Sequence, residues 1–359
     1  MVLRSGFRLV MVAMVALVAA PRQATAQVTV GGVGYLQYAY SLKADSALVP
    51  STGSAGNLNN FDVARAYVNI LGKFSNGVQT RITTDVDGRK AATNQLTIRL
   101  KYAFVGWTPD KSALTFKTGL FTTPWIDYEE ALYGYRMQGT TLYDRNGFFP
   151  SSDFGIGADG TWKGDAVNMQ VGVFDGEGYS NAPGDAGKDA EGRVSVRLAK
   201  TDLGNKVGGL RLTGFAQVGS ATGGSTRTRF IGMLSYKSKQ LTLASEYGIR
   251  QDSTGAKTPS QKGMAFGAYG ILNLPHSKAA LLLRYDIFDP NTDSTSAAGA
   301  TLGNASFDKQ SRIIAGVSYA ISPNLRVMLD LDLNSLQYGS TNAFDVANKN
   351  LYFHTEFTF

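Results

Sequence analysis

The stretch Leu325-Arg-Val-Met-Leu-Asp-Leu-Asp-Leu-Asn334 decides the fold class of this 359-residue chain. Leucine or valine occupies every odd position from 325 to 333, while charged or polar residues fill most of the even positions. Successive side chains of a β-strand point to opposite faces, so the segment is a ribbon with one apolar and one polar face. The same period of two predicts strands at 96–104 and 193–198.

Sixteen segments of this kind follow one another along the chain, and no helical stripe of useful length interrupts them. The predicted strands are 28–43, 61–74, 77–88, 95–107, 112–121, 153–163, 165–175, 191–201, 209–220, 227–237, 239–251, 263–274, 278–289, 309–321, 324–337 and 349–359. Segment 263–274 has the weakest pattern, because glycine and apolar residues occupy both of its faces. The sequence therefore predicts an all-β protein.

The connections between these strands alternate between short and long. Short turns rich in Gly, Asn and Pro lie at 75–77, 109–111, 163–165, 238–239, 275–277 and 322–324, with a somewhat longer turn near 203–208. Longer polar loops lie near 44–60, 88–94, 122–152, 176–190, 221–226, 252–262, 290–308 and 338–348. This alternation of short turns and long loops is typical of an outer-membrane barrel. A sheet in lipid must also close on itself, because lipid cannot satisfy unpaired backbone groups.

We therefore expect a 16-stranded antiparallel transmembrane β-barrel with long extracellular loops and short periplasmic turns. Sixteen strands enclose more space than side chains can fill, which predicts a water-filled channel. A soluble β-sandwich is the alternative, but it needs neither the loop rhythm nor so many strands.

The first 26 residues have the pattern of a cleaved secretory signal. Arg4 and Arg8 precede the uncharged apolar run 9–20, and Ala24-Thr25-Ala26 supplies small residues for cleavage. The run is shorter than a membrane-spanning helix needs, although a retained anchor is the alternative. We expect export from a bacterial cytoplasm and a single barrel at 27–359. Without the signal the net charge falls from +7 to about +4, and no arginine-rich arm for nucleic acid is present.

The composition also excludes several chemistries. The chain has no Cys and only two His, His276 and His354, so disulfides, thiolate metal sites and most histidine-based sites are excluded. No G-x-S-x-G hydrolase motif occurs. His354 and Glu356 share the inward face of the last predicted strand, and a barrel enzyme, if this were one, would depend on His354. We expect no catalytic residues, no cofactor and no metal.

Strand parity assigns the polar faces to the lumen and gathers the basic residues on two arcs. The first arc, on strands two to five, is Arg65, Lys73, Arg81, Arg99, Lys101 and Lys117. The second arc, on strands eight to ten, is Arg193, Arg197, Arg211, Arg229 and Lys237. Several inward acids, among them Asp85, Asp330 and Asp332, face them. Arcs of fixed positive charge raise the local concentration of anions, so we predict that Arg65, Arg81, Arg99, Lys101, Lys117, Arg193, Arg197 and Arg211 line an anion-preferring pore.

The loop 122–152 is the longest and least strand-like connection. Its charged and aromatic members include Trp125, Asp127, Tyr128, Glu129, Glu130 and Arg136. Such a long loop is usually functional or disordered, and its aromatic content argues against disorder. We predict that it folds into the lumen and narrows the pore; an extracellular cap or a subunit contact are the alternatives.

The opposite, apolar faces are expected to meet outer-membrane lipid and lipopolysaccharide. Candidate aromatic girdle residues are Tyr35, Tyr102, Trp162, Tyr236, Tyr247 and Tyr319. The last strand places Leu351, Phe353, Phe357 and Phe359 on one face. A terminal aromatic on such a strand resembles the signal read by barrel-assembly machinery.

Three stretches resemble the phosphate-selective porin family. They are Thr118-Gly-Leu-Phe-Thr-Thr-Pro-Trp-Ile-Asp-Tyr-Glu-Glu130, Val171-Gly-Val-Phe-Asp-Gly-Glu-Gly178 followed by Arg193, and Phe61-Asp-Val-Ala-Arg-Ala-Tyr67. The resemblance implies a homotrimer of 16-stranded barrels that passes small inorganic or organic anions along a lumenal arginine ladder. Arg65, Arg81, Arg99 and Lys117 would belong to that ladder. The loop departs from the family because it carries Asp127, Glu129 and Glu130 and no lysine cluster, which favours general anion preference over phosphate specificity.

The sequence thus predicts a passive porin without enzymatic activity. One alternative is a binding-type channel for a larger organic solute, with the loop tyrosines as a stacking surface. The other is a plugged structural or adhesion barrel that carries no current.

Overall fold

The computed structural model describes residues 26–44, 58–87, 95–181, 184, 186–221, 224–253, 255, 260–292, 300–302, 305–307, 309–337 and 345–359. The predicted signal peptide lies outside the described residues except for Ala26.

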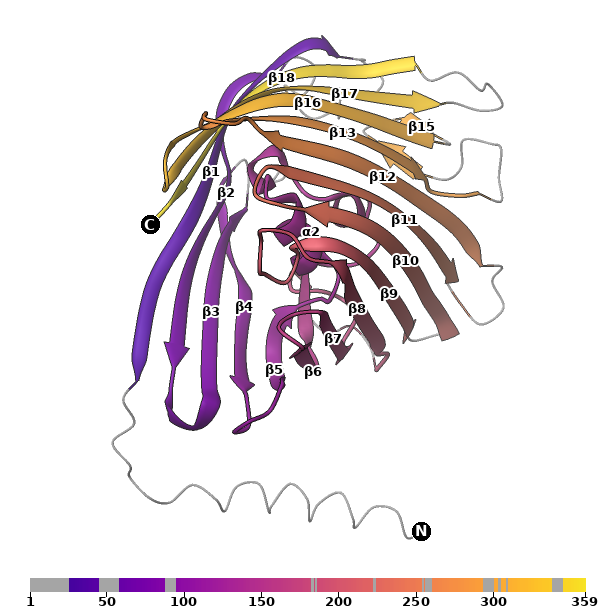
Figure 1. Cartoon of the computed structure of the whole chain (residues 1–359). Helices are drawn as coiled ribbons and strands as arrows, with labels where there is room; N and C mark the ends of the chain where they lie inside the picture. Colours follow the sequence, from indigo (N-terminus) through magenta and orange to yellow (C-terminus); the bar gives the residue numbers. More distant parts are fainter. Residues whose placement is uncertain are drawn as a thin grey trace.

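Sixteen antiparallel strands of the described residues close into one barrel, in which β1 pairs with both β2 and β18 (Figure 1). They are β1 (Gln27–Ala44), β2 (Asn59–Lys73), β3 (Val78–Asp87), β4 (Thr97–Trp107), β5 (Leu114–Thr122), β6 (Ser152–Trp162), β7 (Val167–Phe174), β8 (Asp189–Ala199), β9 (Gly209–Ala221), β10 (Ser225–Lys237), β11 (Leu241–Ser253), β12 (Gln261–Asn273), β13 (Ala279–Asp289), β16 (Lys309–Ser322), β17 (Leu325–Gln337) and β18 (Asp345–Thr358). The predicted strand count and order are confirmed, with boundaries that agree to within four residues.

A small hairpin of β14 (Ala300–Leu302) and β15 (Ala305–Phe307) pairs apart from the barrel, between β13 and β16. The sequence did not predict it, because it lies within a loop that shows no alternation of apolar and polar residues.

Tight turns close one end of the barrel, beside the start of β1 (Figure 1). Between β2 and β3 the turn η2 (Ser75–Gly77) places Asn76 at φ 59° and Gly77 at φ 75°. Lys111, Lys163, Asp165 and His276 also have positive φ in such turns. Asn and Gly tolerate this conformation best, so the pair Asn76-Gly77 marks the β2–β3 turn in the sequence.

The two faces of the wall differ as the alternation predicts. On β17, Leu329 is 46% exposed on the outer face, whereas Asp330 is 1% exposed on the inner face. Outer side chains around the barrel are mostly Val, Leu, Ile and aromatic residues, including Ile98, Ile156, Leu212 and Leu283. In the described residues no helix is long and apolar enough to cross a membrane.

Two of the predicted girdle residues, Tyr35 and Tyr102, face the lumen instead. On β4 the register shifts, so that Thr83 pairs with Tyr102 and Thr84 with Leu100, leaving Lys101 as an extra residue. A β-bulge of this kind reverses the alternation that follows it. Tyr35 has Leu36, 40% exposed, as its outward neighbour. Tyrosine suits either face, so residue type alone misplaced it.

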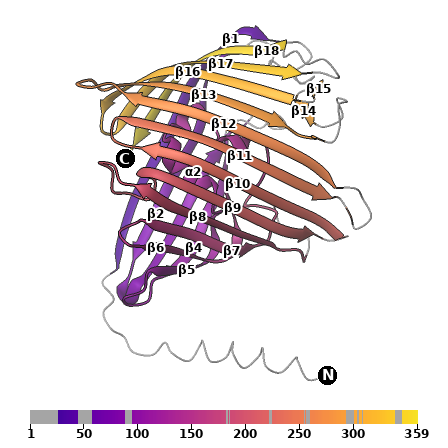
Figure 2. The same cartoon turned by 45° about the vertical axis from the view of Figure 1, so that its right-hand side comes forward.

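The segment between β5 and β6 is not an irregular loop but contains three short helical elements. These are α2 (Ile126–Tyr133), η3 (Arg136–Gln138) and α3 (Leu142–Arg145). Asp127 and Glu129 lie in the first turn of α2, where the helix dipole favours negative charge. Gly134 ends the helix at φ 70°, and its N–H donates to the carbonyl of Glu130. Both views place α2 within the ring of strands (Figures 1 and 2).

Gly119 lies near the end of β5, just before the chain enters the segment between β5 and β6. It has φ 116°, and a Cβ there would lie 2.4 Å from the carbonyl oxygen of Ala103. We expect Gly119→Ala to destabilise the barrel by about 1–3 kcal/mol, because an L side chain is strained in this conformation. The measurement is the temperature at which the folded gel band converts to the unfolded one. Gly214→Ala is the control, because its Cβ would meet open space; equal shifts would contradict the prediction.

Candidate functional site

Residues 123–151, here called the inner loop, pack inside the barrel. Trp125 and Leu132 are fully buried. The Tyr133 ring lies 5.0 Å from that of Tyr269 on β12, and the Phe149 ring lies 4.9 Å from that of Phe215 on β9. Each large apolar side chain removed from water contributes about 1.5–3 kcal/mol. The inner loop is therefore fixed against the wall by a hydrophobic core of its own.

Polar contacts anchor the inner loop to strands on several parts of the barrel. The Tyr128 hydroxyl lies 2.9 Å from Ser195 Oγ on β8, and the Tyr135 hydroxyl lies 2.8 Å from Ser318 Oγ on β16. Arg326 on β17 donates to the carbonyl oxygen of Gly134 at 2.7 Å. These contacts fix the inner loop to the inner face of β8, β16 and β17.

The basic residues of the second arc donate hydrogen bonds to backbone carbonyl groups of the inner loop and of the turns. Arg193 donates from Nε to the carbonyl oxygen of Pro124 at 2.9 Å, and its guanidinium lies 4.4 Å from the Tyr128 ring centre. Arg229 donates to the carbonyl oxygen of Phe148 at 2.8 Å, and Lys237 to that of Leu132 at 2.6 Å. Arg193 and Arg229 are at most 5% exposed.

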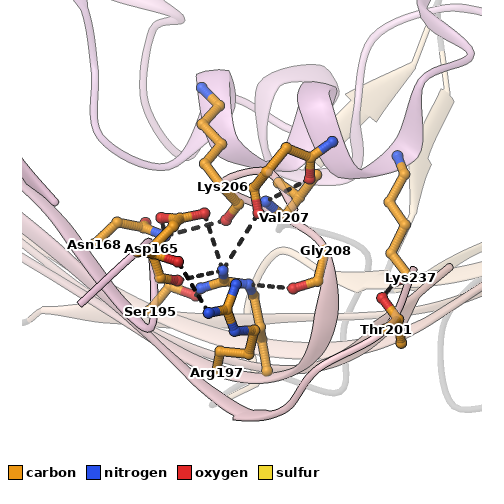
Figure 3. Close-up of polar contacts among 12 residues, drawn as sticks. Asp165, Asn168, Ser195, Arg197, Thr201, Lys206, Val207, Gly208 and Lys237 are labelled. Atoms are coloured by element: carbon orange, nitrogen blue, oxygen red, sulfur yellow. Dashed lines mark hydrogen bonds and ion pairs between the residues drawn. The ribbon is translucent and has the colours of Figure 1, made fainter. Parts of the chain in front are cut away.

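Two further members of the second arc hold turn backbone. Arg211 is fully buried and donates to the carbonyl oxygens of Gly208 and Asp165. Arg197 donates to the carbonyl oxygen of Gly164 at 2.9 Å (Figure 3). Together these contacts make the second arc mainly a scaffold for the inner loop and the turns.

The first arc lies on the wall formed by β2 to β5. Arg65 and Arg99 share one carboxylate, Asp85, at 2.6 and 3.0 Å. Arg81 donates to Thr83 Oγ1 and Asn69 Oδ1, with its guanidinium 4.3 Å from the Tyr102 ring centre. Lys117 forms an ion pair with Asp159. Arg65 and Arg99 therefore meet at the same carboxylate, whereas Arg81 has only neutral hydrogen-bond partners in the described part of the chain.

Lys101, the bulge residue, occupies an unusual position. Its Nζ donates to Ser151 Oγ of the inner loop at 3.2 Å. The rings of Tyr67, Tyr102 and Tyr179 surround it at 5.1 to 5.7 Å. The residue is only 3% exposed, yet no carboxylate among the described residues forms an ion pair with it. Ring faces attract an ammonium, so they partly replace the missing counter-ion.

Two cavities lie on either side of this contact. One, of about 420 Å³, lies between the inner loop and the wall; its lining includes Tyr35, Tyr67, Arg81, Lys101, Tyr102, Asp127, Glu130, Arg136, Arg326 and Glu356. The other, of about 490 Å³, is lined by Phe148 to Ser151, Gly176 to Asn181, Arg227 and Arg229 among others. Lys101 lines the first cavity and Ser151 the second, so their hydrogen bond marks the boundary between them.

Every acid predicted in the inner loop has a partner. Asp127 Oδ2 lies 2.5 Å from Lys206 Nζ, and Glu130 accepts from Arg136 Nε at 2.8 Å. Glu129 accepts from Trp125 Nε1 at 3.1 Å. The Lys206 contact was missed because it joins segments 79 residues apart; the one available signal was the unusual length of the turn near 203–208.

The charged groups lining the 420 Å³ cavity sum to a positive value. Four are cations, namely Arg81, Lys101, Arg136 and Arg326, and three are carboxylates, namely Asp127, Glu130 and Glu356. Fixed positive charge on low-dielectric walls favours anions over cations.

His354 contacts an acid and an aromatic ring on the inner face of the barrel. Its Nε2 lies 2.9 Å from Asp330 Oδ2, and its ring stacks on Tyr352. Its cross-strand neighbours are Gln37 and Met328. In the described residues no group of three or more potential metal ligands is present.

No protein-family model and no curated protein matches the sequence. Solved structures are similar across nearly the whole chain. An anion-selective porin from Comamonas acidovorans covers 93% of this chain and 100% of its own, with 11% identity and a TM-score of 0.63. The outer-membrane channel DcaP of Acinetobacter baumannii covers 93% and 97%, with 10% identity and a TM-score of 0.63. OmpT of Vibrio cholerae, in a trimer form, covers 93% and 99%, with 12% identity and a TM-score of 0.59. The fold is that of outer-membrane porin structures, without a specific tie to the phosphate-selective branch.

Glu129 of the inner loop is the centre of a buried cluster of charged groups. Glu129 is fully buried and faces Glu246 on β11, Arg284 and Asp286 on β13, and Thr141 of the inner loop itself. Burial raises the pKa of Glu129 from 4.5 to about 7, although the charge of Arg284 opposes this. The folded state therefore favours the protonated carboxyl. Its contribution to stability is complete below pH 4.5 and is lost as pH rises through about 7.

We expect the wild-type barrel to lose thermal stability between about pH 4.5 and 7, by up to about 1.4 kcal/mol per pH unit. Glu129→Gln keeps an acceptor for Trp125 while removing the titration, so its profile should be flatter. Glu130→Gln is the matched control on the same helix. The check is thermal denaturation at a series of pH values; parallel wild-type and Glu129→Gln profiles would count against Glu129 as the titrating group.

Proposed function

We propose that this chain forms a passive channel of the bacterial outer membrane that prefers small anions and performs no chemistry on them. The observation that carries the proposal is the pair of cations, Arg81 and Lys101, that line the 420 Å³ cavity without a carboxylate partner in the described residues. The predicted signal peptide, the apolar outer face and the porin fold all support this location.

Ion selection follows from the placement of charge across the cavity. Arg81 and Lys101 stand on the wall, whereas the inner loop presents Asp127 and Glu130, each with a cationic partner. An entering anion meets wall cations that lack a full counter-charge, whereas a cation meets carboxylates that are already neutralised. The difference lowers the electrostatic barrier for anions along this path.

Phosphate or similar anions are suitable solutes within this class. Guanidinium groups bind tetrahedral and planar oxyanions through paired hydrogen bonds, and Arg65, Arg81 and Arg99 stand on neighbouring strands. The resemblance to phosphate-selective porins supports these solutes. The pairing of Asp127 and Glu130 removes the main objection, which was the acidic character of the inner loop.

The alternatives differ in how well the geometry supports them. Tyr128, Tyr133 and Tyr135 are buried and line neither the 420 Å³ nor the 490 Å³ cavity. In a channel for larger organic solutes, the stacking surface would have to be Tyr35, Tyr67 and Tyr102, which line the 420 Å³ cavity. A barrel without current is the second alternative, because Lys101 and Ser151 meet between the two cavities.

Planar-bilayer recordings under a potassium chloride gradient test the proposal. The reversal potential of the wild type should show chloride selectivity, and Arg81→Gln with Lys101→Gln should lower the anion-to-cation permeability ratio by about threefold or more, since both cations border the path. Lys111→Gln, in an exposed turn, should leave the ratio unchanged. Cation selectivity of the wild type would contradict the anion preference, and absence of current would favour the plugged barrel.

We also propose that the functional unit is a homotrimer surrounded by outer-membrane lipid and lipopolysaccharide. The trimer form of a structurally similar protein and the predicted family resemblance support this assembly. Native mass spectrometry of the detergent-solubilised protein should give a mass of three chains. A folded, conducting species with the mass of one chain would contradict it.

A further inference from the structure

The turn between β8 and β9 packs against the inner loop. Val207 is only 3% exposed and belongs to the same hydrophobic core as the inner loop. The Lys206 and Lys237 side chains extend from this region in the same direction, away from the turn (Figure 3). Lys237 reaches the carbonyl oxygen of Leu132 and Lys206 reaches Asp127, so both meet α2.

Side chains from two other segments, β7 and β9, fix the backbone of this turn. Arg211 Nε donates to the carbonyl oxygen of Gly208 at 2.8 Å. Asn168 Nδ2 donates to the carbonyl oxygen of Lys206 at 3.1 Å and to Asp165 Oδ1 at 2.9 Å (Figure 3). Hydrogen bonds to the backbone therefore hold Lys206 in place. The ion pair made by its side chain is not needed to fix the turn.

The ion pair between Lys206 and Asp127 is exposed to solvent. The Lys206 side chain is 45% exposed and that of Asp127 is 39% exposed, at an Nζ to Oδ2 distance of 2.5 Å. An exposed ion pair contributes about 0–1 kcal/mol to stability, so folding gains little from it. A fixed charge bordering a water-filled path, in contrast, acts on every ion that passes.

We propose that Lys206 is a selectivity-determining residue of the channel, which neutralises Asp127 at the turn end of the constriction and thereby keeps the path favourable to anions. This inference rests on the proposed function and extends it to a residue outside both predicted arcs. Asp127 lines the 420 Å³ cavity. Without Lys206 its carboxylate would stand in that cavity with no ion-pair partner among the described residues, and the net positive charge around the path would fall by one.

Lys206→Gln and Asp127→Asn form the two arms of a charge cycle. Lys206→Gln exposes the carboxylate, so the anion-to-cation permeability ratio should fall by about twofold or more, and Lys206→Glu should lower it further. Asp127→Asn leaves the lysine unpaired, so the ratio should rise. The double variant restores zero net charge at this place and should return close to the wild-type ratio.

Lys200→Gln is the matched control. Lys200 lies in the same turn, is exposed, and makes no ion pair with any described residue, so its loss changes the net charge equally without touching α2. Folding of every variant is checked by the heat-dependent gel shift, which these exposed substitutions should leave unchanged.

The outcomes separate this inference from the proposed function. An anion-selective wild type with Lys206→Gln and Lys200→Gln indistinguishable would overturn the role of Lys206 and leave the channel standing. A double variant that keeps the full effect of Lys206→Gln would show that Asp127 is not the group being neutralised, which also overturns it. A wild type that carries no current, or that selects cations, would overturn the proposed function itself.

Discussion

Backbone hydrogen bonding is complete around the barrel because β1 pairs with β18, and the other features of the molecule follow from this closure. A sheet with two open edges would leave N–H and C=O groups unpaired, which lipid cannot satisfy. Closing sixteen strands removes the edges but encloses more volume than wall side chains can fill. The inner loop occupies part of that volume with a hydrophobic core built from Trp125, Leu132 and Tyr133, and a narrow space lined by polar groups is left beside it.

The inward basic residues accordingly divide into two physical roles. Arg193, Arg211 and Arg229 are buried and donate to backbone carbonyl groups, where a charged donor satisfies acceptors that water does not reach. Arg81 and Lys101 border the remaining space and have hydroxyl, amide and aromatic partners. Residue type and strand parity are the same in both groups. What separates them is whether they bond the backbone of the inner loop or a turn, as Arg193, Arg211 and Arg229 do, or border the open cavity.

Local patterns predicted the strands well, because period-two alternation and turn residues are properties of neighbouring positions. The facing of Tyr102 was predicted wrongly, since the bulge at Lys101 depends on pairing with β3 and leaves no mark in the sequence of β4 alone. The helices of the inner loop were missed because their apolar residues pack on several strands at once rather than along one stripe. The pairing of Asp127 with Lys206 and the division of the basic arcs arise from contacts across the lumen, which a sequence pattern does not encode.

The anchors of the inner loop also impose an order on the assembly of the molecule. Tyr135 contacts Ser318 over a separation of 183 residues, and Gly134 accepts from Arg326 over 192 residues. Contacts of such long range form late, because a large loop of chain must be closed before they are gained. The inner loop therefore precedes two of its partner strands in the chain by more than 180 residues. Its contacts with β16 and β17 form only when those strands complete the barrel. The barrel therefore closes, and the inner loop takes its final position beside the channel, in the same step of folding.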